Sequence, residues 1–72
     1  NPATAFINLS VSSAIAGAKP TGYVYNGLGS LVKTFSITGT YQKINIELLP
    51  PGLYSVRFAY NKNSFTFLFI KK

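Results

Sequence analysis

The sequence predicts an all-β domain, built as a small antiparallel β-sandwich of about seven short strands. Short runs in which apolar and polar residues alternate recur along the chain, and glycine, proline, asparagine and serine separate them. No segment carries apolar residues at helical spacing between good capping residues. With 72 residues, of which 47% are hydrophobic and 15% aromatic, the chain is long enough for a single domain with a small core.

Three strands are expected in the first half of the chain, over residues 5–11, 21–26 and 31–35. In the first of them Ile7, Leu9 and Val11 share one face. Gly22 interrupts the second strand and predicts a β-bulge there. The loop Asn26–Gly29, with the sequence NGLG, is typical of a hairpin because asparagine and glycine tolerate positive φ.

The second half is expected to hold three more strands, over 43–48, 54–60 and 65–70, after a polar connection over 36–42. The turn at Pro50–Gly52 starts the middle one, since proline sets φ and glycine adopts a conformation closed to other residues. Along this strand, apolar side chains alternate with Ser55 and Arg57. In the strands over 43–48 and 54–60, the side chains expected in the core are Ile44, Ile46, Leu48, Tyr54, Val56 and Phe58.

The final strand, 65–70, is apolar on both faces: three phenylalanines lie on one, and Leu68 and Ile70 lie beside Thr66 on the other. Such a strand is normally covered on both sides. Left uncovered it is an aggregation hazard, and lysines flank it as gatekeepers. Two explanations stay open. Either a loop or an upstream domain covers the strand, or the strand docks to a partner by edge pairing or through its spare apolar face.

Residue types that carry most protein chemistry are missing. The chain has no cysteine, histidine or aspartate, and its one carboxylate side chain is Glu47. This excludes a disulfide framework, zinc and calcium sites, and the paired carboxylates of a glycosidase. The NGLG loop lacks the Gly-Lys-Ser/Thr ending of a phosphate loop. We therefore expect no catalytic, cofactor-binding or metal-binding residues, and no enzyme.

The net charge of +6 suits an anionic partner. The cations are spread singly except for Lys71 and Lys72, whereas a nucleic-acid footprint clusters its charge and gives steep salt dependence. Nucleic acid is therefore not an expected partner. An accessory β-sandwich of a secreted hydrolase, with or without carbohydrate binding, is a further alternative. Its sugar platform would use Tyr23, Tyr25, Tyr41 and Tyr60.

Four motifs follow one another along the whole chain: an opening NPAT with the strand INLSV, then YVYNGLGSLVKTF, then INIELLPPGLYSVRFAY, then a terminal FIKK. In this order and spacing they resemble the C-terminal sorting domain of the type IX secretion system, type A, found on exported proteins of Bacteroidetes. The resemblance implies an Ig-like sandwich that the outer-membrane translocon reads. It also implies that a sortase-type peptidase commonly removes the domain once the cargo reaches the surface.

The resemblance carries roles onto individual residues. Asn1 and Pro2 match the opening motif. Phe69 and Ile70 are added to the residues of the later motifs because the last strand is a candidate docking element. The candidates for recognition by the translocon are Gly29, Gly52, Tyr54, Val56, Phe69, Ile70, Lys71 and Lys72.

The resemblance also implies partners and a location. The partners are the type IX translocon, the outer-membrane shuttle and sortase proteins, and a cargo domain upstream in the same parent chain. The positive charge fits anionic lipopolysaccharide or an acidic face of the translocon, and the sequence does not choose between them. Residues 1–72 are expected to be one sorting domain, excised from a larger exported protein that crosses the periplasm to the cell surface or the medium.

Overall fold

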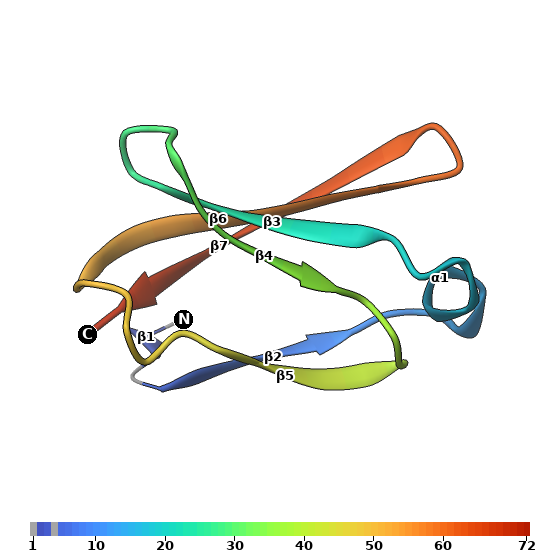
Figure 1. Ribbon diagram of the computed structural model, residues 1–72, viewed down its shortest axis with the longest axis horizontal. Coiled ribbons are helices and arrows are strands. Elements are labelled where there is room, and N and C mark those ends of the chain that lie inside the picture. The colour runs from blue at the N-terminus through green and yellow to red at the C-terminus, as the bar shows by residue number, and fades with distance from the viewer. Residues whose placement is uncertain (1, 4) are drawn as a thin grey trace.

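The computed structural model describes residues 2–3 and 5–72, and over these residues the chain forms seven strands and one short helix (Figure 1). The elements are β1 (Pro2–Ala3), β2 (Phe6–Ser10), α1 (Ser13–Ala18), β3 (Thr21–Asn26), β4 (Leu31–Ser36), β5 (Tyr41–Asn45), β6 (Gly52–Tyr60) and β7 (Asn63–Lys71). Strands make up most of the described chain, so the predicted all-β class is confirmed.

The strands form two sheets that face each other across the core (Figure 1). The larger sheet has the order β1-β7-β6-β3-β4, and the smaller sheet pairs β2 with β5. These pairs are antiparallel except for β1, which runs parallel to β7 with Pro2 opposite Ile70. The predicted antiparallel sandwich is confirmed, with one short parallel pair at its edge.

The core consists of the inward side chains of both sheets, together with Ile37 and Ile46 from the connections on either side of β5. In the smaller sheet Ile7 lies opposite Ile44, and in the larger sheet Val24 lies opposite Val56. All four are buried, and burying an aliphatic side chain of this kind contributes about 1.5–3 kcal/mol. Leu9 is buried beside them, so the predicted inward face of β2 is confirmed.

The hairpin of β6 and β7 turns an aromatic face toward the core. Tyr54 stacks on Phe69 with ring centroids 5.2 Å apart, and Phe58 stacks on Phe65 at 5.1 Å. The members of each pair lie directly opposite one another in the ladder. Such pairs contribute about 0.5–1.5 kcal/mol beyond their buried area. The alternation predicted for this strand is confirmed.

The predicted hairpin loop after Asn26 is present, and a second hairpin joins β6 to β7. The loop after Asn26 contains Gly29 at φ 83°. The hairpin between β6 and β7 is tight, since Asn61 and Lys62 alone connect the two strands, at φ 52° and 69°. Two central residues with positive φ give the turn a twist that matches the flanking strands.

The sequence does not predict α1. The Ser12 hydroxyl accepts a hydrogen bond from the Ile15 N–H at 3.3 Å and caps the start, and Lys19 ends the helix at φ 53°. A helix of six residues is too short to show apolar periodicity and is not stable alone. It persists here because Ala16 is buried and Ile15 packs against the core.

The fourth predicted strand is displaced. It occupies Tyr41–Asn45 instead of 43–48, and Leu48, expected in the core, is 96% exposed. The Asn45 side chain accepts a hydrogen bond from the Glu47 N–H at 2.9 Å, and this turn ends the strand early. The preceding connection is less polar than expected, because Ile37 within it is fully buried.

The bulge predicted at Gly22 is wrong. Gly22 pairs regularly with Phe35, and the register shift lies between Val24 and Tyr25. A side chain at Gly22 would overlap the Phe35 ring. Glycine is therefore needed because the aromatic ring crosses the backbone of β3 at this point.

We expect Gly22→Ala to lower the free energy of unfolding by about 1–3 kcal/mol, because the methyl group displaces the Phe35 ring. In a Phe35→Ala background the same change should be neutral or stabilising, since alanine loses less entropy than glycine on folding. Urea unfolding followed by circular dichroism measures both. Gly17→Ala in α1 is the control, because its methyl group meets nothing within 4 Å. A loss at position 22 that persists without the ring would contradict this explanation.

Candidate functional site

Most of the candidate recognition residues lie at one end of the sandwich. This end consists of residues 27–30, 46–52 and 70–72, and we call it the loop end; it lies at the left of Figure 1. Gly52 lies opposite Lys71 in the ladder of β6 and β7. Asn26, at the start of the β3–β4 loop, lies opposite Tyr54. The candidates that share the loop end are Gly29, Gly52, Ile70, Lys71 and Lys72.

The β3–β4 loop is closed by its own asparagine. The Asn26 Oδ1 atom accepts hydrogen bonds from the N–H groups of Leu28 at 2.9 Å and Ser30 at 3.0 Å. Gly29 has the left-handed φ that favours glycine, and no atom lies within 4 Å of the position a Cβ would take. The loop is thus fixed in shape, and its surface at Gly29 is open.

The connection from β5 to β6 is held by local hydrogen bonds. The Leu49 N–H donates to the Ile46 carbonyl at 3.0 Å, and the Tyr54 hydroxyl donates to the Pro50 carbonyl. Gly52 then enters β6 at φ 154°, which other residues rarely adopt. The predicted turn at Pro50–Gly52 therefore has a sufficient structural explanation.

Lys71 clamps this connection to the end of β7. It continues the inward series that includes Phe69 and is only 7% exposed. Its Nζ atom donates to the carbonyl oxygens of Leu49 at 2.7 Å and Glu47 at 3.1 Å. Hydrogen bonds from a charged donor are about twice as strong as neutral ones. Since a buried ammonium group without acceptors is costly, the lysine and the connection hold each other in place.

Three candidates lie in the core. Tyr54, Val56 and Phe69 are 5%, 0% and 3% exposed. In the folded domain these side chains act through the packing that supports the loop end. Ile70, at 48% exposure, and Lys72 are instead open to solvent.

The two faces of the last strand are treated differently. Toward the loop end its inward face is covered, because Phe69 is buried and Phe67 packs against the core, whereas Phe65 near the far end of the strand is 38% exposed. On the outward face Leu68 is 61% exposed, and Leu53 lies opposite Ile70 with both about half exposed. No segment among the described residues covers this outward strip. Among the described residues, β1 pairs with the edge of β7 at Ile70 and Lys71.

The tyrosines of the sugar-binding alternative do not form one platform. Tyr23 and Tyr25 share β3 in the larger sheet, whereas Tyr41 is an exposed residue of the smaller sheet. Tyr60 continues the inward series of β6 at the opposite end from the loop end. The structure therefore brings together two of the four residues.

The cations are also dispersed. The Lys43 ammonium group lies 5.5 Å from the Phe6 ring centroid on the smaller sheet, and the Arg57 guanidinium lies 5.6 Å from the Tyr25 ring on the larger one. Over residues 2–3 and 5–72, no three histidine, cysteine or acidic residues gather as metal ligands. In the same residues no helix has the length and apolar character needed to cross a bilayer.

Comparison with known families gives a match over residues 1–72, to the secretion system C-terminal sorting domain. The chain belongs to this family. It is a sorting signal of type IX secretion, as its motifs imply, and marks a protein exported to the cell surface or beyond. Domains of this family are in general non-catalytic and act with the type IX secretion system. No curated protein and no solved structure matched the chain.

The sequence-based prediction was wrong about the environment of two side chains in the sorting domain. Lys71 looked like an exposed basic end, although its place two residues after Phe69 in the alternation already indicates an inward side chain. The alternation over 43–48 predicts Leu48 in the core, which is wrong because a turn at Asn45 ends the strand first. Asn1, matched to the opening motif, lies outside the described residues.

We expect Lys71→Ala to lower the free energy of unfolding by about 1–3 kcal/mol, because the carbonyl groups of Glu47 and Leu49 lose their donor. Lys72→Ala removes the same charge from an exposed position and should change stability by less than about 0.5 kcal/mol. Urea unfolding of both variants measures the difference. Equal losses for the two lysines would show that Lys71 is no clamp.

Proposed function

We propose that the loop end is the surface read by the type IX translocon. The sorting domain, residues 1–72 of a larger exported protein, takes an upstream cargo domain from the periplasm across the outer membrane. Shuttle and sortase proteins of the outer membrane are its partners, and a sortase-type peptidase removes it at the cell surface. The domain itself catalyses nothing and needs no cofactor.

The observation that carries this proposal is the meeting of three separate motifs at the loop end. The β3–β4 loop, the β5–β6 connection and the C-terminus are remote in sequence, yet the register of β6 and β7 sets Gly52 beside Lys71. Large apolar side chains are also exposed there, including Leu28 at 92% and Leu48 at 96%. Exposed apolar side chains that gather in this way are typical of interaction surfaces.

Charge supports a contribution from electrostatics. The chain carries +6, and Lys72 is exposed at the loop end. Attraction to anionic lipopolysaccharide or to an acidic face of the translocon would raise the rate of encounter and weaken as salt is added. The buried candidates Tyr54, Val56 and Phe69 contribute by keeping this end in shape.

A transport assay tests the proposal. Residues 1–72 are fused to a reporter with an ordinary export signal, in a bacterium with a working type IX system. We expect the reporter at the surface or in the medium. The double variant Ile70→Ser/Lys72→Ala should retain more reporter in the periplasm, because it removes exposed contacts and spares the clamp at Lys71.

The matched control is Lys62→Asn, which removes one charge at the opposite end and keeps a residue that tolerates positive φ. It should be exported like the parent fusion. Urea unfolding confirms that each variant is folded. Retention of the folded parent fusion in the periplasm would contradict the sorting role of these residues, and normal export of the double variant would contradict the role of the loop end.

A further inference from the structure

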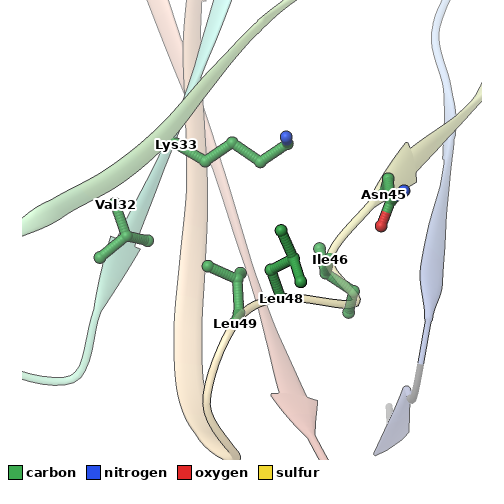
Figure 2. A pocket seen from close by; sticks show the side chains of 6 residues that line it. All are labelled: Val32, Lys33, Asn45, Ile46, Leu48 and Leu49. Carbon is green, nitrogen blue, oxygen red and sulfur yellow. The ribbon is translucent and has the colours of Figure 1, made fainter.

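β4 and β5 belong to different sheets. At one end the two strands are tied together, because the Gln42 side chain donates to the Ser36 carbonyl at 2.9 Å and accepts from the Thr38 N–H at 2.9 Å. Toward the loop end the two strands diverge (Figure 1). There a pocket of about 290 Å³ opens, lined by Val32, Lys33, Asn45, Ile46, Leu48 and Leu49 (Figure 2).

The bulge in the larger sheet supplies one wall of this pocket. Val24 lies opposite Lys33 and Tyr25 lies opposite Leu31, so Val32 is the extra residue. Val24 is fully buried, and a residue directly opposite it shares its inward face. Lys33 therefore points inward, and the bulge lets its neighbour Val32 line the same pocket. Figure 2 shows the lysine reaching from β4 toward the end of β5.

The β5–β6 connection supplies the other wall. Leu48 and Leu49 project into the pocket (Figure 2), and Lys71 holds this connection by its bonds to the carbonyl groups of Glu47 and Leu49. The exposed Leu48 is thus kept beside the pocket by a clamp and not by burial of its own side chain. An exposed apolar surface with a fixed shape is suited to binding an apolar side chain of a partner.

The edge of the sheet beside the pocket is also open. β4 is the last strand of the larger sheet, so the backbone groups along one side of it have no strand partner among the described residues. The pocket has about the lower limit of the volume that encloses a small-molecule ligand. In peptide recognition by strand addition, backbone pairing gives affinity and such pockets take alternate side chains.

We propose that this edge and pocket bind an extended segment of a partner protein that carries an aliphatic and an acidic residue two positions apart, so that both side chains lie on the same face of the added strand. The segment adds to β4 as a further strand. It places an aliphatic side chain between Val32 and the leucines of the β5–β6 connection, and a carboxylate at the Lys33 ammonium group. This role rests on the proposed sorting function, since the partner is then a protein of the export machinery.

Charge complementarity selects this occupant. The chain has seven cationic side chains and one carboxylate, so a second copy would bring repulsion to Lys33. An inward-pointing charge on an edge strand also discourages pairing between copies. An acidic strand supplies the opposite charge together with the backbone that β4 can pair with. A lipid or a polysaccharide supplies the charge alone.

The probe is a short synthetic peptide with the repeat Ile-Thr-Asp-Thr, in which isoleucine and aspartate share one face of the strand, added to the 72-residue chain. Amide NMR spectra should shift at residues 31–36 and 46–49, and the exposed amides of β4 should exchange more slowly. A peptide of the same repeat with lysine in place of aspartate should cause neither effect. Lys33→Gln should weaken binding of the acidic peptide about fivefold, the upper range for a partly exposed ion pair.

Lys43→Gln is the matched control. It removes the same charge from the smaller sheet, where Lys43 lies over the Phe6 ring, and should leave affinity within about twofold of the parent. Equal weakening by both changes would reduce the effect to diffuse charge attraction and overturn the proposal. Shifts confined to the edge of β7, or no shifts, would overturn it as well.

The reporter fusion separates this inference from the sorting function. A folded Lys33→Gln fusion should be exported less than the parent. If it is exported normally, the pocket is no sorting contact, and the sorting function itself stands. If the parent fusion is retained although the peptide binds as expected, the binding site stands, and the sorting function of these residues does not.

Discussion

The register between β6 and β7 is the constraint from which the loop end follows. The two strands are joined by Asn61 and Lys62 alone, and a two-residue turn with positive φ leaves little freedom to slip. A shift by one residue would turn every side chain of β7 to the other face. The Tyr54–Phe69 stack would be lost, and Lys71 would point away from the connection that it holds.

The unequal widths of the two sheets explain why the domain has both a core and open apolar surfaces. A two-stranded sheet faces one of five strands, so part of the larger sheet cannot be covered from that side. A chain of 72 residues has few elements left for the task, and small domains bury a smaller share of their surface. Exposed groups therefore remain along β4 and on the outward face at Leu68 and Ile70. The proposed contacts with other proteins lie on such surfaces.

The sequence predicts those parts of the fold that depend on local alternation. Tyr54 and Val56 were assigned to the core correctly because period-two burial is visible within a single strand. Leu48 was assigned wrongly because a side-chain turn at Asn45 ended the strand before the alternation did. The inward direction of the Lys33 side chain cannot be predicted from the sequence, because it depends on where the pairing of β3 and β4 shifts register. For the candidate site, the sequence motifs identify the individual residues. That the β3–β4 loop, the β5–β6 connection and the C-terminus lie together is shown by the fold alone.

Lys71 illustrates why the candidate site cannot be divided into structural and recognition residues by sequence alone. Its ammonium group fixes the carbonyl groups of the β5–β6 connection, and that connection carries Leu48, which lines the pocket beside β4. Loss of Lys71 would therefore alter a surface formed by residues more than twenty positions earlier. Lys72, one residue further, is exposed and makes no such bond within the described residues. Removing both lysines together would change a contact and its support at once, so the two must be varied separately before either is assigned to recognition.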